Sequence, residues 1–172
     1  VYTDATGKAV SGGFAVGKYG VAKGFGENYL FMTEENYLIG HRAGDSITLG
    51  VYNLLCGFES GINSTTGNNN SFFGYQSGYE NTDGSNNLFL GYQSGYNNTS
   101  GSFNSFMGYQ SGFSNTSGFS NAFVGSYSGY SNTSGSYNSF IGQSAGYSNT
   151  DGSGNSFMGI ETGFNNTSGS YN

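Results

Sequence analysis

The sequence predicts an all-β protein, a parallel β-solenoid or β-roll built from coils of 17 residues. Three observations lead to this fold class. An asparagine recurs every 17 residues from Asn36 to Asn172, which gives eight complete units over residues 36–172. Glycine occupies the fifth, ninth and fifteenth positions of every unit, and the chain holds 32 glycines and no proline. A strict period without insertions indicates that each unit meets its neighbour in the same way.

Each unit is expected to form two short strands joined by tight corners. Three glycines in 17 residues disfavour a helix, because each costs about 1 kcal/mol relative to alanine in a helix interior. We expect one strand near positions one to four and a corner at the fifth-position glycine, which tolerates a positive φ. A second short strand is expected around positions eight to twelve, followed by a turn at Asn-Thr-x-Gly. Eight coils stacked at the strand spacing of about 4.8 Å make a rod of roughly 38 Å.

The domain organisation follows the limits of this period. Residues 1–35 keep glycine and aromatic residues but lack the 17-residue repeat. We expect them to form an N-terminal cap or docking segment, because terminal repeats are usually atypical. Residues 36–172 are expected to be the β-solenoid itself.

Stacked coils place identical residues above one another, which predicts ladders of like side chains. Position ten is aromatic in most units and is expected to form a second aromatic column inside the coil, while asparagines at positions one and twelve are expected to form polar ladders. The aromatic ladder at position three consists of Phe72, Phe89, Phe106, Phe123, Phe140 and Phe157.

Position four is apolar in every unit, and this predicts self-association. Side chains alternate between the two faces of a strand, so position four faces outward if position three faces inward. Eight outward apolar residues in a row form a stripe that a monomer rarely tolerates. We therefore expect a homo-oligomer, a parallel trimer, or a filament-forming rod.

Composition and charge exclude several classes of protein. The net charge is −6, and charged residues make up 8% of the chain, so the basic stripe that a nucleic-acid-binding protein needs is missing. No run of 18 or more apolar residues is present, so we expect no membrane insertion as a helix.

No catalytic, metal-binding or cofactor-binding site is expected. His41 and Arg42 lie next to Asp45, but a polar outward group explains them better than a catalytic base, which needs a nucleophile and an orienting partner. Cys56 falls in the apolar column at position four and is interpreted as a small hydrophobic residue. The carboxylates of one column lie several coils apart, so neither a catalytic pair nor a repeated calcium site is expected.

Asn-x-Ser/Thr sequons are frequent, as expected by chance in a chain rich in asparagine, serine and threonine. If the chain is glycosylated, we expect the sugars at the turn formed by position twelve. The candidate acceptors are Asn63, Asn98, Asn115, Asn132 and Asn166.

Two stretches carry a resemblance to known families. The unit NSFMGYQSGFSNTSG at residues 104–118, and the earlier stretches KAVSGGFAVGKYG and NYLFMT, resemble repeat regions of large bacterial surface and fibre proteins, notably from Bacteroidetes. Such proteins often end in an endosialidase-type chaperone domain. The opening Asn-Ser-apolar-apolar-Gly is also similar to the head repeats of YadA-like trimeric autotransporter adhesins. The unit here is longer and carries phenylalanine where small aliphatic residues are usual. The resemblance implies a cell-surface location and a trimeric parallel β-roll.

These observations lead to one principal hypothesis of function and two alternatives. We expect a non-catalytic extracellular structural module, a rigid stalk or filament segment of a surface fibre or adhesin. One alternative is a self-assembling fibril subunit of the functional-amyloid type, since Asn172 begins a ninth unit whose open edge can template pairing. The other is a glycan-binding face made by exposed tyrosines at position six, Tyr75, Tyr92 and Tyr109.

Overall fold

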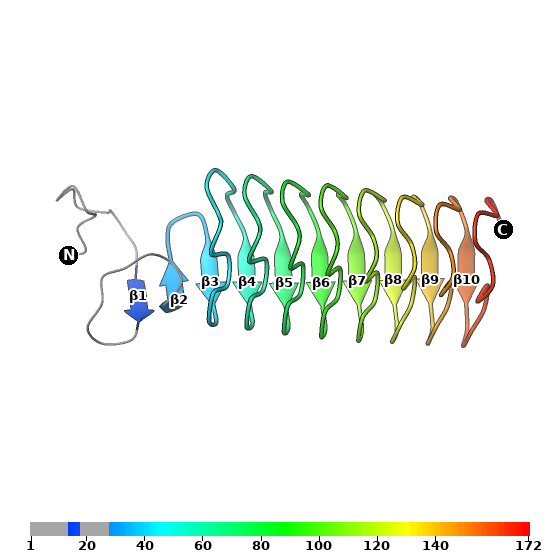
Figure 1. Ribbon diagram of the computed structural model, residues 1–172, viewed down its shortest axis with the longest axis horizontal. Coiled ribbons are helices and arrows are strands. Elements are labelled where there is room, and N and C mark those ends of the chain that lie inside the picture. The colour runs from blue at the N-terminus through cyan, green and yellow to red at the C-terminus, as the bar shows by residue number, and fades with distance from the viewer. Residues whose placement is uncertain (1–13, 18–27) are drawn as a thin grey trace.

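The computed structural model describes residues 14–17 and 28–172, and these form ten strands and no helix (Figure 1). All ten strands belong to one sheet in which they follow one another in chain order. The strands are β1 (Phe14–Gly17), β2 (Asn28–Met32), β3 (Tyr37–Ile39), β4 (Leu54–Cys56), β5 (Ser71–Phe73), β6 (Leu88–Leu90), β7 (Ser105–Met107), β8 (Ala122–Val124), β9 (Ser139–Ile141) and β10 (Ser156–Met158).

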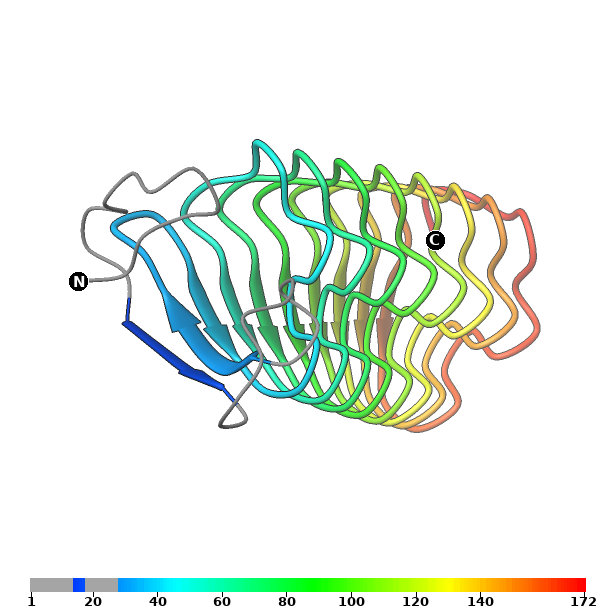
Figure 2. The same ribbon diagram turned by 60° about the vertical axis from the view of Figure 1, so that its left-hand side comes forward.

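Strands β3 to β10 form a parallel stack with a register of one unit per strand. Leu38 pairs with Leu55, and Phe106 pairs with Phe123, each 17 residues further along the chain. The chain therefore makes seven turns of 17 residues between β3 and β10. Figure 2 shows the strands in one row along the stack, with the irregular part of each coil closing the opposite side. The predicted all-β class and the parallel 17-residue β-solenoid are confirmed.

The strands before the repeats run differently. β2 pairs antiparallel with β3, with Phe31 opposite Leu38, and β1 pairs antiparallel with β2. The antiparallel strand β2 therefore occupies the edge of β3 that faces away from the repeats. Residues 1–13 and 18–27 of the expected N-terminal segment lie outside the described residues.

The core is a pillar of phenylalanine rings from position three. Five of the rings, from Phe72 to Phe140, are fully buried, and Phe157 in the last strand packs against them. Neighbouring rings stack with centroids 4.7–5.1 Å apart and planes within 14° of parallel. A Cβ on the ninth-position glycine, such as Gly112, would collide with the ring of its own coil. Glycine at position nine therefore makes room for the ring.

Two asparagine ladders lie in the interior beside the phenylalanine pillar. At position one, Asn104 donates from Nδ2 to the carbonyl of Gly118 (2.8 Å), and its Oδ1 accepts from the backbone N–H of Asn121 (3.0 Å). At position twelve, Asn115 donates from Nδ2 to Asn98 Oδ1 (2.7 Å) and to the same Gly118 carbonyl (3.0 Å). These side chains are buried. Buried amides are compatible with folding because their polar atoms are paired.

Replacing Asn104 by alanine is expected to lower the free energy of unfolding by about 2–4 kcal/mol. The change removes one of the two donors to the Gly118 carbonyl, which keeps its bond from Asn115, and leaves the Asn121 N–H without its acceptor. The lost hydrogen bond costs about 0.5–1.5 kcal/mol and the unsatisfied buried N–H about 1–3 kcal/mol. Chemical denaturation followed by circular dichroism measures the change. Ser100→Ala, at an exposed position, is the control; equal stability of the two variants would contradict the ladder.

The predicted second strand at positions eight to twelve is wrong. These residues form turns, because the backbone has a positive φ at position seven, 50° at Gln93, and again at position nine, 61° at Gly95. Two left-handed residues so close together interrupt an extended strand. Hydrogen bonds between coils nevertheless continue here, as between the N–H of Gly95 and the carbonyl of Ser111 (3.0 Å).

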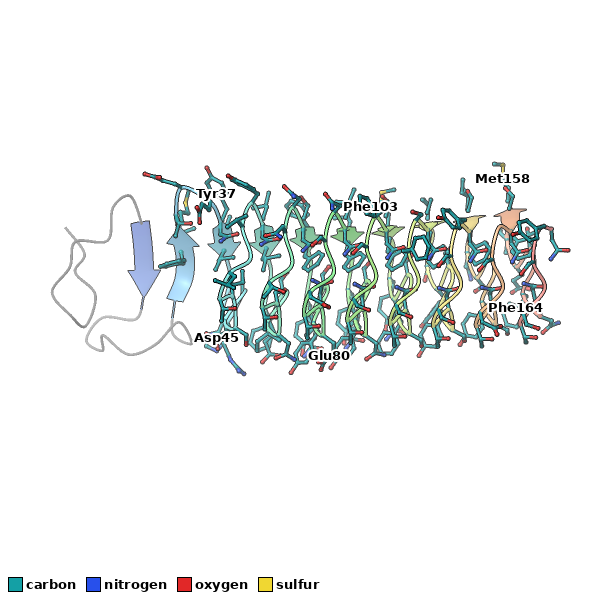
Figure 3. The ribbon with its side chains drawn as sticks, turned by 90° about the horizontal axis from the view of Figure 1, so that it is seen from above. Tyr37, Asp45, Glu80, Phe103, Met158 and Phe164 are labelled. Carbon is teal, nitrogen blue, oxygen red and sulfur yellow. The ribbon has the colours of Figure 1, made fainter. Side chains whose placement is uncertain are left out.

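The outer face of the sheet carries no charge, is apolar at position four in every coil, and has serine at position two in four coils. Positions two and four point outward on either side of the buried position three, and Leu90 and Met158 are 47% and 76% exposed. None of the seven charged residues in 36–172 falls at positions one to four or seventeen. Figure 3 shows Tyr37, Phe103 and Met158 on this side of the rod, and Asp45 and Glu80 on the opposite side. We call the outward side chains of positions two and four the sheet face.

Candidate functional site

A row of exposed aromatic rings follows the corner after each of the strands β4 to β7. The corner glycine at position five has a φ of 125–147° in every coil, and it turns the next residue, at position six, outward. Tyr75, Tyr92 and Tyr109 are 42%, 41% and 45% exposed, and neighbouring rings stack at 5.1 Å. Phe58 continues the row at 5.3 Å from Tyr75, and His41 stacks on Phe58 at 5.5 Å. Because the rings lie face to face, the tyrosines present their edges to solvent.

A ladder of amide side chains at position seven runs beside this row. Gln110 donates from Nε2 to Gln93 Oε1 (2.8 Å), and Gln93 donates to Gln76 Oε1 (2.9 Å). Gln76 donates to Glu59 Oε2 (2.9 Å), and Glu59 Oε1 accepts from Arg42 (3.1 Å). These hydrogen bonds join five consecutive coils. They offset part of the strain of a non-glycine residue at positive φ.

This amide ladder was not predicted from the sequence. Its signal was nevertheless present, since glutamine occupies position seven in three consecutive units. Positive φ at a long side chain is uncommon, so a strand-like interpretation of the unit gave no reason to expect it there.

The second aromatic column, at position ten, is present but lies at the surface. Its rings stack at 4.8–5.2 Å. The rings are half-buried, so the expectation of a column inside the coil is wrong. The asparagines of position twelve take the interior place instead. The column consists of Tyr79, Tyr96, Phe113, Tyr130, Tyr147 and Phe164.

Tyr127 joins the two aromatic columns. It occupies position seven, where the preceding coils have glutamine, and its ring meets Tyr109 edge-on at 5.3 Å. On its other side it contacts Tyr130 at 5.8 Å and Tyr147 at 6.3 Å. The columns at positions six and ten therefore belong to one surface, which we call the tyrosine face.

The free energy of unfolding of the chain is expected to fall at alkaline pH because of two tyrosines in the tyrosine face. Desolvation raises the pKa of Tyr96, with neighbouring Tyr79 and Glu80 adding to the effect. Desolvation and the Tyr109 phenol raise the pKa of Tyr127. A raised folded-state pKa means that the folded chain holds these protons more tightly, so stability falls as pH rises through the unfolded value of about 10. Thermal melts at pH 9 and 11 measure the fall. It should be smaller in a Tyr96→Phe, Tyr127→Phe double variant, and an unchanged fall would contradict the assignment.

The polar group in the first coil forms ion pairs. Arg42 contacts the carboxylates of Asp45 (3.4 Å) and Glu59 (3.1 Å), while His41 stacks on Phe58. Cys56 lies half-buried on the sheet face among apolar neighbours in the column. Within residues 14–17 and 28–172, no three His, Cys, Asp or Glu side chains gather where they would hold a metal ion.

The candidate glycosylation sites fall into two groups. Asn98, Asn115 and Asn132 are fully buried in the position-twelve ladder, and the Nδ2 of each donates two hydrogen bonds. The expectation that sugars sit at position twelve is therefore at odds with the fold at these three residues, because a glycan on Nδ2 would break those bonds. Asn63 and Asn166 are half-buried, and Asn63 donates to Glu80 Oε2 (3.0 Å).

The fold places the chain among repeat proteins of the parallel β-solenoid class. No protein-family model, curated protein or solved structure matches it. No helix in the described part of the chain is long and apolar enough to span a membrane.

Proposed function

We propose that the chain is a non-catalytic structural module, a rigid stalk or filament segment of an extracellular surface fibre or adhesin. The observation that carries this proposal is the continuity of the stack. Each coil is hydrogen-bonded to the next at the strand and at the turns. From the third coil onward two asparagine ladders also join the coils, and the phenylalanine ring of each coil stacks on that of the next. Because each inner coil is bonded to similar coils above and below it, force is transmitted along the rod, as a stalk requires.

Two measurements test this proposal. Small-angle X-ray scattering of the full chain should give the distance distribution of an elongated particle. Antibodies against the repeats should label intact, unpermeabilised cells of the source organism. A compact scattering particle, or labelling only after the cells are opened, would overturn the stalk function.

The filament alternative requires coils of one chain to stack on those of the next. At the β3 end, that edge is already paired with β2 in antiparallel orientation. Growth by parallel stacking at this end therefore requires β2 to leave. Sedimentation of the full chain over a range of concentrations distinguishes the two functions, because only the fibril subunit grows without limit.

The glycan-binding alternative is supported by the tyrosine face. Three phenol hydroxyls at a spacing of one coil, beside an amide ladder, offer a linear row of hydrogen-bonding groups along the rod. Tyr and amide side chains are typical of adaptable polar binding surfaces. A glycan array probed with the wild-type chain and with Tyr92→Ala tests the idea, with Phe103→Ala on the other side of the rod as the control. Binding that survives Tyr92→Ala, or no binding at all, would exclude this face.

A further inference from the structure

We propose that the sheet face pairs with the sheet face of a second copy of this chain, the two rods running parallel around a twofold axis along their length. This inference rests on the proposed function as a structural rod and names the partner that covers its apolar side. It differs from the trimer expected from the sequence.

The size of the sheet face suits a dimer interface. Eight strands at about 4.8 Å and five residues from position seventeen to position four at about 3.3 Å give roughly 600 Å² per copy. Two copies together bury roughly 1,200 Å², which reaches the lower limit of specific, stable interfaces. This area includes the aromatic residues Phe103 and Tyr137 at position seventeen, which are 63% and 64% exposed.

The two columns of the sheet face differ in side-chain size within most coils. In β7 to β10, position two is serine or alanine, and position four is methionine, valine or isoleucine. β5 follows the same pattern with Ser71 and Phe73, and β4 reverses it with Leu54 and Cys56. Six of the eight coils thus pair one small residue with one larger residue. Only β3 and β6 carry two large residues.

This asymmetry selects the symmetry of the pair. A twofold axis parallel to the rod places position four of one copy opposite position two of the same coil in the other. Each of the six coils then matches a large side chain with a small one, including β4, where Leu54 meets the partner's Cys56. An axis across the rod instead places position four opposite position four, so one side of the interface is overfilled and the other is left empty. Close packing disfavours such an arrangement.

The repeat also keeps the two copies in register. Both rods have the same strand spacing, so every coil of one meets the matching coil of the other, as in the dry interfaces of paired sheets. The strands of the sheet face lie side by side in one row (Figures 1 and 2). One partner rod therefore covers this row along its whole length, whereas a threefold axis would divide it between two partners. The acidic turns point away from the interface, which keeps like charges apart (Figure 3).

The first experiment enlarges the small column. Mass photometry and sedimentation equilibrium of the full chain should show a dimer that weakens at least tenfold in a Ser105→Leu, Ser139→Leu variant. Ser100→Leu, Ser134→Leu, at exposed positions of the turn side, is the matched control and should leave the dimer unchanged. If the first variant associates as tightly as the wild type or more tightly, the association is non-specific and hydrophobic, and the proposal is overturned. A monomeric or trimeric wild type also overturns it. Thermal melts followed by circular dichroism are used to check that both variants fold.

The second experiment measures the direction of the copies. In a Cys56→Ala background, which keeps position four of β4 small and apolar, a spin label is attached through cysteine at Ser100, near the middle of the rod, or at Asp151, near its end; both are exposed. Parallel copies give the same label-to-label distance at both sites. In antiparallel copies the two Asp151 labels are offset by five coils, about 24 Å along the rod, and the longer distance overturns the proposal. A monomer in these experiments leaves the stalk function intact, since that function is tested separately by scattering and surface labelling.

Discussion

Replacing Phe106 by alanine is expected to lower the free energy of unfolding by about 3–5 kcal/mol. The ring is fully buried and lies between Phe89 at 4.9 Å and Phe123 at 4.8 Å. Its removal leaves a cavity that the backbone cannot close, because hydrogen bonds with the coils on both sides fix the distance between them. Chemical denaturation of wild type and variant measures the difference.

The matched control is Phe103→Ala, which removes the same side chain from a position 63% exposed. This variant should stay within about 0.5 kcal/mol of the wild type, as surface substitutions usually do. A similar loss in Phe103→Ala and Phe106→Ala would mean that the ring pillar is not the core of the rod.

Replacing Gly108 by alanine is expected to destabilise the chain by more than about 3 kcal/mol, or to prevent folding. Gly108 has a φ of 144°, which an L-residue rarely adopts, and an added Cβ would collide with the backbone carbonyl of Gly125 in the next coil. The collision is with backbone on the stacking axis, so no side-chain rearrangement relieves it. The free energy of unfolding and the yield of folded protein measure the effect.

The control for Gly108→Ala is a glycine with positive φ at a tolerant position. Gly154 lies at position seventeen with a φ of 70°, and its added Cβ would meet the exposed side chain of Tyr171. Asn69 and Asn86 already adopt this conformation at the same position, with φ of 57° and 60°. Gly154→Asn should therefore be nearly neutral. If Gly154→Asn destabilises the chain as much as Gly108→Ala does, the close approach of the next coil's backbone does not explain why position five requires glycine.

The interior was only partly predictable from residue types. Phe106 and its equivalents were assigned to a ladder because phenylalanine recurs at position three in six consecutive units, and they do stack. Asn115 and its equivalents were expected to form a polar ladder and do so, but the turn to which they were also assigned, where a sugar would be accessible, lies inside the coil. Asparagine is typical both of turns and of stacked amide ladders, and the residue type does not distinguish them.

The surface shows the same division. Tyr75, Tyr92 and Tyr109 were expected to be exposed, and they are. The column at position ten was expected inside the coil but lies at the surface. The glutamine ladder was not predicted. Both differences come from the left-handed residue at position seven, such as Gln93 with a φ of 50°. A single positive φ redirects the side chains that follow it, and alternation along an extended strand no longer assigns their faces.

The sequence by itself determined the period, the parallel register and the residues that stack on one another. These depend on contacts between neighbouring coils, and a repeat of 17 residues places the same residue types in the same contacts each time. Only the tertiary structure decided that position ten lies at the surface and position twelve inside, and that each coil has one strand and not two. Those outcomes depend on how the chain closes each coil, because the positive φ angles at its corners set the direction of every side chain after them.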